Sequence, residues 1–497
     1  MSPTSSDSPR LAPPVSAARR VAAKSQRMRS NRAHKRFEQT FWAVVATLSI
    51  VSAVFLLLGT LQGPKLSSAV VDSARVTEQA GQQLRLFANQ PLAEVTAEQV
   101  TVTPATEVLV TVQNDLLIVQ FEQRLLSSTE YTVEVRDVPA TSRDATATFT
   151  HRFITSAAEL LYLDRGDDID EVLRTPVDGT GRGELVYAAV GIQRIATVEN
   201  VTVVARDASG GTSVLDVVSR DGAVQQVRLP EGVRIERLIA PPVGTLLGMV
   251  LSTATAPLDG DEAGQAGDEG QQTLSSVLAV VDLAADDIVT IVQGLDGLPI
   301  TTLNAQFLPD GATMIAHDFD QNVLRVELVG APLVLPIGQM TEVYALSSDG
   351  TRLTGGDSFG GVVLNLATGV ETRLDPSLVD GKLAFGGESI LTATELRVQK
   401  VAVVDATTSE SKVVLVADEG TGVARVLLRT IDDRGSLGAI SLAPNDQFVA
   451  VEVTPSVVDA QPDGRPVNGR PTSVTTIIVN VQSGAVVRTL NGFSPVW

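Results

Sequence analysis

The chain has 497 residues, 44% of them hydrophobic, so it is long enough for two or three domains and too apolar to be disordered throughout. It has no cysteine, which excludes disulfides, thiolate metal sites and cysteine nucleophiles, and its three histidines leave little of the usual catalytic base and metal ligand. The formal net charge of -20 argues against nucleic-acid binding by the body of the chain.

Residues 1–40 are basic, with nine Lys or Arg against two Asp or Glu, whereas the remaining residues carry a net charge of -27. This segment is rich in Ser, Pro, Ala and Arg and cannot build a core, so we expect a disordered basic cytoplasmic tail. Its basic side chains could touch anionic lipid, but a plain topology signal is the simpler interpretation.

The stretch FWAVVATLSIVSAVFLLLGTL, residues 41–61, has no ionisable side chain. As a helix it would be about 31 Å long, close to the roughly 30 Å hydrocarbon core of a bilayer. It predicts a transmembrane helix, a signal-anchor that holds the chain in the cytoplasmic membrane. The alternative is a cleaved signal peptide, for which SSA at 67–69 is a weak cleavage site and the apolar run is too long.

Flanking charge predicts the orientation of this helix. Residues 21–40 carry six Lys or Arg, and residues 62–81 carry two. Positive flanks stay in the cytoplasm, so the N-terminus is expected inside and everything from about residue 62 outside.

Residues 66–155 alternate in the manner of strands and predict a β-sandwich. Six β-rich runs are separated by polar turns, at 83–92, 98–104, 107–113, 116–125, 130–138 and 146–155. The stretches NQPL, VTVTP, STEYTVEV and FTHRFIT resemble the bacterial Ig-like domain of the S-layer SbsA type. That resemblance implies a spacer or adhesive module without catalytic residues, and His151 is interpreted as a strand-edge residue.

Residues 156–497 repeat two pieces. The first is an apolar run, a tight turn and a second strand, with turns at Pro309-Asp310-Gly311, Ser348-Asp349-Gly350 and Pro444-Asn445-Asp446. The second is a strand, a polar turn and another strand, as at 363–374 and 478–490. The first turn recurs after 39 residues (309 to 348) and the second after 40 (365 to 405). A period near 40 with short strands predicts a β-propeller, for which we count seven blades.

The paired turn motifs resemble the TolB-like and YVTN/WD40-like propeller families. The predicted fold is therefore an all-β ectodomain, an Ig-like β-sandwich plus a seven-bladed β-propeller, behind one N-terminal transmembrane helix. The chain ends in TLNGFSPVW (489–497), and the propeller begins with only three strands, so we expect this C-terminal segment to complete the first blade. Two polar insertions, 256–272 and 459–473, are expected to form loops.

Two short polar stretches are weak candidates for a site. DRGDDIDE offers Asp164, Asp167, Asp168 and Asp170 to a calcium ion, although it lacks the spacing of a calcium loop and a solvated turn is simpler. HDFD offers His317, Asp318 and Asp320 for binding, although a half-exposed strand edge also explains them. No catalytic residue, cofactor or nucleotide motif is predicted.

Two functional interpretations stay open. In the first, the chain is a membrane-anchored binding or scaffold protein of the bacterial cell envelope, whose propeller face holds a protein, a peptide or an envelope glycan. In the second, it is an anchored propeller hydrolase or lyase. Scarce histidine and the missing motifs favour the first and make an enzyme the weaker interpretation.

Overall fold

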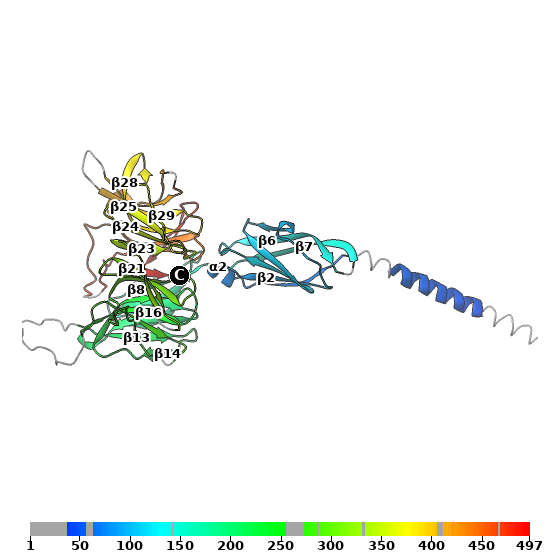
Figure 1. Cartoon of the computed structure of the whole chain (residues 1–497), viewed down its shortest axis with the longest axis horizontal. Coiled ribbons are helices and arrows are strands. Elements are labelled where there is room, and N and C mark those ends of the chain that lie inside the picture. The colour runs from blue at the N-terminus through cyan, green and yellow to red at the C-terminus, as the bar shows by residue number, and fades with distance from the viewer. Residues whose placement is uncertain are drawn as a thin grey trace, which may run out of the picture.

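The computed structural model describes residues 37–55, 63–141, 143–254, 273–285, 288–330, 333–404, 411–420, 422–465 and 468–497. The described residues are mostly β. Figure 1 shows a helix, a β-sandwich and a ring of sheets, in that order, along the longest axis of the molecule. The predicted basic tail up to residue 36 and the insertion 256–272 lie outside the described residues.

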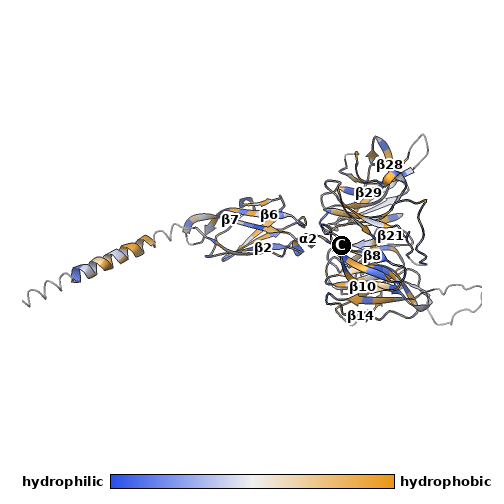
Figure 2. Cartoon of the chain, turned by 180° about the vertical axis from the view of Figure 1, so that it is seen from behind, coloured by the Kyte–Doolittle hydropathy of each residue, from blue (hydrophilic) through white to orange (hydrophobic). Residues whose placement is uncertain are grey.

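The N-terminal helix runs from Phe37 to Phe55 and is long and apolar enough to cross a membrane. None of its most apolar window is buried in the rest of the chain, and apolar residues line most of its length in Figure 2. It begins four residues before the predicted start at 41, and the predicted end at 56–61 is not described. A signal sequence near the N-terminus would also meet these criteria of length and apolar composition.

The β-sandwich consists of two sheets with the strand orders β1-β2-β5-β4 and β3-β6-β7. Each of the six predicted runs contains a strand, whereas β1 was not predicted. Leu84 and Val119 of the first sheet pack with Val133 and Phe149 of the second in one buried cluster. The elements are β1 (Leu66–Val70), α2 (Arg75–Glu78), β2 (Gln83–Ala88), η1 (Ala97–Gln99), β3 (Val100–Thr103), β4 (Val108–Gln113), β5 (Leu116–Phe121), β6 (Glu130–Ala140) and β7 (Arg143–Ile154).

After the sandwich the described residues form seven antiparallel sheets. The first is β8 (Glu159–Arg165), β9 (Asp170–Pro176), β10 (Glu184–Ala189) and β36 (Phe493–Val496); the second is β11 (Ile192–Val198), β12 (Val201–Asp207), β13 (Ser213–Val218) and β14 (Val224–Val227); the third is β15 (Val233–Ile239), β16 (Leu246–Thr253), β17 (Val277–Asp282) and β18 (Thr290–Ile291). The fourth is β19 (Thr302–Phe307), β20 (Thr313–Asp318), β21 (Asn322–Glu327) and β22 (Leu333–Gln339); the fifth is β23 (Glu342–Leu346), β24 (Arg352–Asp357), β25 (Gly360–Asn365) and β26 (Glu371–Arg373). The sixth is β27 (Leu378–Val379), β28 (Lys382–Leu391), β29 (Arg397–Val404), β30 (Ser411–Asp418) and β31 (Arg425–Leu428); the seventh is β32 (Ser436–Leu442), β33 (Phe448–Thr454), β34 (Thr475–Asn480) and β35 (Val486–Asn491). Two short 3₁₀ turns, η2 (Ser209–Gly211) and η3 (Ile431–Asp433), lie in the connections.

The sheets contact one another in a closed ring. The innermost strands β11, β15, β19, β23 and β28 each contact the next, β30 contacts β32, and β36 contacts both β32 and β11. Buried clusters fill the space between neighbouring sheets, as where Leu247 and Met249 of β16 pack against Leu215 of β13. Antiparallel sheets arranged radially in a closed ring are a β-propeller.

The ring is closed by the end of the chain, as predicted. In β36, Phe493 pairs with Leu163 of β8 and Val496 pairs with Leu161. The predicted segment was too long, because residues 489–491 belong to β35, the outer strand of the seventh sheet. Gly492, whose φ of 137° suits glycine, separates the two strands.

The sandwich is joined to one side of the ring by hydrogen bonds. Asn445 Nδ2 donates to the carbonyl of Leu125 (3.0 Å) and to Ser127 Oγ (2.9 Å). Arg124 Nη1 donates to the carbonyl of Ser348 (3.0 Å). The turns that carry the repeat motif in the fifth and seventh sheets therefore face the sandwich, on the side of the ring that lies next to it in Figure 1.

The opposite side of the ring, here called the far face, carries the other set of connections. Neighbouring strands in a sheet run antiparallel, so successive connections alternate between the two sides. The far face therefore holds the connections β8–β9, β20–β21, β24–β25 and β33–β34, together with the links from each sheet to the next.

Candidate functional site: the arginine-rich mouth of the ring

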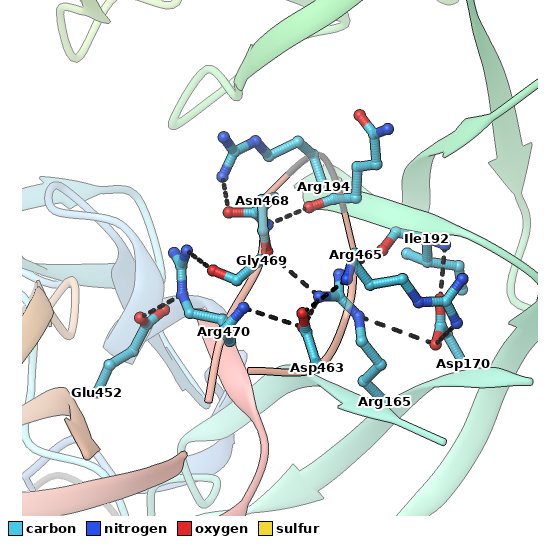
Figure 3. A network of polar contacts seen from close by, with 11 residues as sticks. Arg165, Asp170, Ile192, Arg194, Glu452, Asp463, Arg465, Asn468, Gly469 and Arg470 are labelled. Carbon is cyan, nitrogen blue, oxygen red and sulfur yellow. Dashed lines mark hydrogen bonds and ion pairs between the residues drawn. The ribbon is translucent and has the colours of Figure 1, made fainter. Parts of the chain in front are cut away.

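The loop between β33 and β34 lies on the far face and is held there by ionic contacts (Figure 3). This is the predicted insertion 459–473, and the structure places it against the first and second sheets. Its partners there come from β8, β9 and β11, which lie far away in the sequence.

Asp463 organises the loop. Its two carboxylate oxygens accept from the backbone N–H of Arg465 (3.0 Å) and of Arg470 (2.9 Å), and it is ion-paired with Arg165 of β8. Burial would raise the pKa of Asp463, but the two backbone donors and the Arg165 guanidinium outweigh it and hold the pKa below its ordinary value. The carboxylate form is thus the one this loop conformation requires.

Asp170, the first residue of β9, holds the loop through Arg465. Its side chain is fully buried, and it accepts from the backbone N–H of Ile192 (2.8 Å) and from Arg465 Nη2 (3.2 Å). A carboxylate buried without such partners would be costly, so Asp170 fixes the position of Arg465.

Glu452 and Phe493 form the third anchor. Glu452 accepts from Arg470 Nε (3.2 Å) and from the backbone N–H of Ser494 (2.9 Å). The guanidinium carbons of Arg165 and Arg470 lie 4.8 and 5.4 Å from the centre of the Phe493 ring. The loop, the closing strand β36 and the first sheet are therefore tied together at one place.

Arg194 of β11 differs from these arginines because no carboxylate lies within ion-pair distance of it among the described residues. Its Nη1 donates to Asn468 Oδ1 (2.9 Å) and its Nε to the carbonyl of Glu236 (3.1 Å). Burial lowers its pKa, and the nearby cations Arg470 and Arg237 lower it further, whereas the more distant Glu452 carboxylate acts in the opposite direction. Arg194 is thus a half-buried cation with several other cations nearby.

Side-chain hydrogen bonds also connect neighbouring inner strands of the ring. Arg194 of β11 bonds to β15, Arg237 Nη1 of β15 donates to Asn304 Oδ1 of β19 (3.1 Å), and Asn304 Nδ2 donates to the carbonyl of Val343 in β23 (3.0 Å). The inner strands are therefore polar where they end at the far face. This arginine-rich region is called the mouth below and contains Arg165, Arg194, Arg237, Arg465 and Arg470.

This arrangement offers cationic hydrogen-bond donors and few groups that act as a general base or hold a metal ion. Guanidinium groups bind carboxylates and phosphates in two-pronged geometry. None of the contacts at the mouth involves a histidine, and the described residues contain no cluster of three or more His, Asp or Glu that could hold a metal ion. The donors gathered here are of the kind that suits an anionic group.

The four predicted calcium ligands do not converge. Asp164 accepts from Arg182 Nη2 (2.6 Å), Asp167 and Asp168 are exposed in the turn, and Asp170 is buried against the arginines of the loop. The solvated-turn interpretation fits Asp167 and Asp168, whereas Asp170 is structural. Calcium binding stays an untested prediction.

The predicted cluster His317, Asp318 and Asp320 is also divided. His317 is buried, not half-exposed, and its Nε2 donates to the carbonyl of Met340 (2.8 Å), which lies in the connection between β22 and β23. Asp318 accepts from the backbone and side chain of Asn322 and so stabilises its own turn, and Asp320 is exposed at the tip of that turn. His151 lies on the edge strand β7 of the sandwich, as interpreted.

The arginines of the mouth were not predicted. The loop did carry a signal, since DGRP and NGRP repeat within residues 463–471 and each supplies an arginine. No sequence motif marks Arg165, Arg194 and Arg237, because their strands meet the loop only when the ring closes.

Large apolar side chains stand exposed around this mouth, on connections of the far face. Phe359 is 87% exposed, Val458 90% and Ile431 84%, and Phe319 and Ile169 are about half exposed. They belong to connections of the first, fourth, fifth, sixth and seventh sheets, so they are distributed around the far face. Exposed apolar groups gathered on one face are typical of an interaction surface.

No protein-family model and no curated protein matches the chain. It is similar in structure to 333 solved chains. They include the dihydro-heme d1 dehydrogenase NirN (12% identity, TM-score 0.38, 68% of this chain and 74% of that one) and a TolB from Agrobacterium tumefaciens (17%, 0.33, 54% and 86%). A prolyl endopeptidase is a third (13%, 0.44, 66% and 49%). All three identities are below 25%, and all three TM-scores are below 0.5.

Proposed function

We propose that this chain is a single-pass membrane-anchored, extracytoplasmic binding protein. The helix would hold it in the cytoplasmic membrane, the sandwich would act as an Ig-like spacer, and a seven-bladed propeller would present its far face to a protein or peptide partner. An envelope glycan is a weaker candidate, because several exposed groups on the far face are aliphatic.

The domain assignments have support in the strand order. Labelled A to G along the chain, the two sheets of the sandwich have the orders A-B-E-D and C-F-G, which are those of a constant-type Ig domain. The seven sheets of the ring support seven blades, six with four strands and one with five. A domain of this kind suits a spacer.

The observation that carries the proposal is the asymmetry between the two sides of the ring. The turns on one side are occupied by the sandwich, through Asn445 and Ser348. The far face exposes Phe359, Val458 and Ile431, which are apolar groups of the kind that are buried in protein interfaces. Of the two sides, the far face is thus the one open to a partner.

Site-specific photo-crosslinking of the full chain in its native membranes tests this function. A photoreactive phenylalanine analogue replaces Phe359 on the far face or, as the control, the half-exposed Val224 on the outer strand β14. We expect an adduct of one protein from position 359 and none from 224.

A second change links the adduct to the far face. Val458→Asp, combined with the probe at 359, should abolish the adduct, whereas Val224→Asp should leave it unchanged. The proposal is wrong if the adduct forms equally from both probe positions, or if it survives Val458→Asp.

A further inference from the structure

We infer that the arginine-rich mouth binds an oxyanion, a carboxylate or a phosphate group, between Arg194 and Arg237. This deepens the proposed function by naming a chemical group that the far face would recognise. It is carried by the charges of the mouth and not by the exposed apolar residues.

Two arginines of the mouth, Arg194 and Arg237, take no part in the ion pairs among its described residues. Arg165 pairs with Asp170 and Asp463, and Arg465 pairs with Asp170. Arg470 pairs with Glu452, and Arg234 pairs with Glu236 at 3.4 Å. Among the described residues, no ion pair is formed by Arg194 or Arg237.

The two unpaired arginines lie on adjacent inner strands, with donors to spare. Arg194 Nε donates to the carbonyl of Glu236, the residue before Arg237, so its guanidinium lies beside the start of Arg237. Asn468 fixes its Nη1, and its Nη2 has no partner within the described part of the chain. Arg237 is exposed, and among the described residues its guanidinium is bonded only through Nη1, to Asn304. Both guanidinium groups therefore have N–H donors that bond to none of the described residues.

Holding the loop does not by itself require these charges. Asn468 could be bound by a neutral amide donor, whereas a half-buried guanidinium beside like charges carries a desolvation and repulsion cost. Arg237 and Arg470 both lower the pKa of Arg194, which is the sign of that repulsion. An oxyanion at the mouth would offset the repulsion and accept from both guanidinium groups. In a chain with a net charge of -20, such a cationic pair also steers anions to this one place.

The inference is tested on the purified full chain in a non-ionic detergent, with inorganic phosphate and succinate as probes and chloride at matched ionic strength as the reference. Titration calorimetry and thermal unfolding report binding. We expect saturable binding and a raised melting temperature with at least one probe. The stronger probe tells whether the group is a phosphate or a carboxylate.

The test variant is Arg237→Gln, because this side chain is exposed and holds no loop. It should weaken binding at least tenfold and leave the melting temperature without probe unchanged, while Arg237→Lys should retain part of the affinity. The matched control is Arg373→Gln, since Arg373 is already paired with Asp357 (2.5 Å) on the outer strand β26.

The inference is overturned if neither probe binds saturably, or if Arg237→Gln binds as tightly as the unchanged chain. Equal loss in Arg373→Gln would also overturn it, because binding would then follow net charge alone. None of these outcomes involves Phe359 or Val458, so a failure here is distinct from a failure of the crosslinking experiment.

Discussion

Phe493, near the C-terminus, lies directly opposite Leu163 of β8, and the pair joins the last strand of the chain to the first strand of the propeller. The Phe493 ring is 1% exposed, and two guanidinium groups lie over it. Beyond it, Trp497 stacks on Phe448 of β33, with ring centres 6.4 Å apart. The closing strand therefore packs against both of the sheets that it connects.

Replacing Phe493 should destabilise the ring. Phe493→Ala removes a fully buried ring and should lower the free energy of unfolding by about 3–5 kcal/mol. Denaturant unfolding of the full chain in detergent measures the change. Val487→Ala, on the half-exposed strand β35, should change it by no more than about 0.5 kcal/mol. An effect of Phe493→Ala as small as that of the control would contradict closure by β36.

Removing the Asn445 side chain should loosen the joint between sandwich and ring. Asn445→Ala deletes two interdomain hydrogen bonds and leaves the Leu125 carbonyl unpaired, at a cost of about 1–3 kcal/mol. We expect faster amide hydrogen exchange at residues 124–128. Asn322→Ala, which removes an amide from the β20–β21 turn on the far face, should leave that exchange as it was. Unchanged exchange in Asn445→Ala would mean that the joint depends on other contacts.

The loop over the mouth should depend on the charge of Asp463. Its pKa lies below the ordinary 3.8, so its stabilising contribution is fully present above pH 3.8 and is lost as the pH falls through the lower value of the folded state. Asp463→Asn should therefore destabilise the chain at pH 7, by about 1–3 kcal/mol, and the difference from the unchanged chain should narrow as the pH falls below 3.8. Unfolding curves at several pH values measure this, with the exposed Asp168→Asn as the control. A difference that stays constant with pH would rule out the carboxylate as the cause.

A charge in the N-terminal helix should release the chain from the membrane. Val51→Arg adds about 2.5–3.5 kcal/mol to the cost of inserting the helix. Fractionation of cells should find more of this variant in the soluble fraction, and Val51→Leu should behave like the unchanged chain. For the unchanged chain, protease added to spheroplasts should remove the sandwich and the propeller. Protection of both would contradict the proposed orientation.

Local patterns predicted much of the fold. The tight turns at 309–311 and 348–350 were recognisable because Gly311 and Gly350 adopt a positive φ and the aspartates before them bond to the backbone of their own turns. The strand β1, LSSAV, was missed, since its two serines give no clear alternation and only pairing with β2 makes it a strand. His317 was taken for an edge residue because nothing in the sequence indicates that the Met340 carbonyl covers it.

The candidate site could not be predicted in the same way. Arg165 and Asp463 come from the first and seventh sheets, and they meet only because the ring closes. The lone arginines Arg194 and Arg237 look in sequence like any surface cation. Whether these two arginines are available to a ligand depends on which carboxylates are paired with other arginines, and the tertiary structure alone determines that pairing.

The pairing of β36 with β8 also sets an order of assembly. When the sandwich and the first strands of the ring have left the ribosome, β8 has β9 and β10 on one side and nothing on the other. Its partner is made last, so the earliest sheet of the propeller is the final one to be completed. Without β36, β8 would keep an open strand edge, and in the extracytoplasmic location proposed above the first sheet could be completed only after residues 493–496 have crossed the membrane.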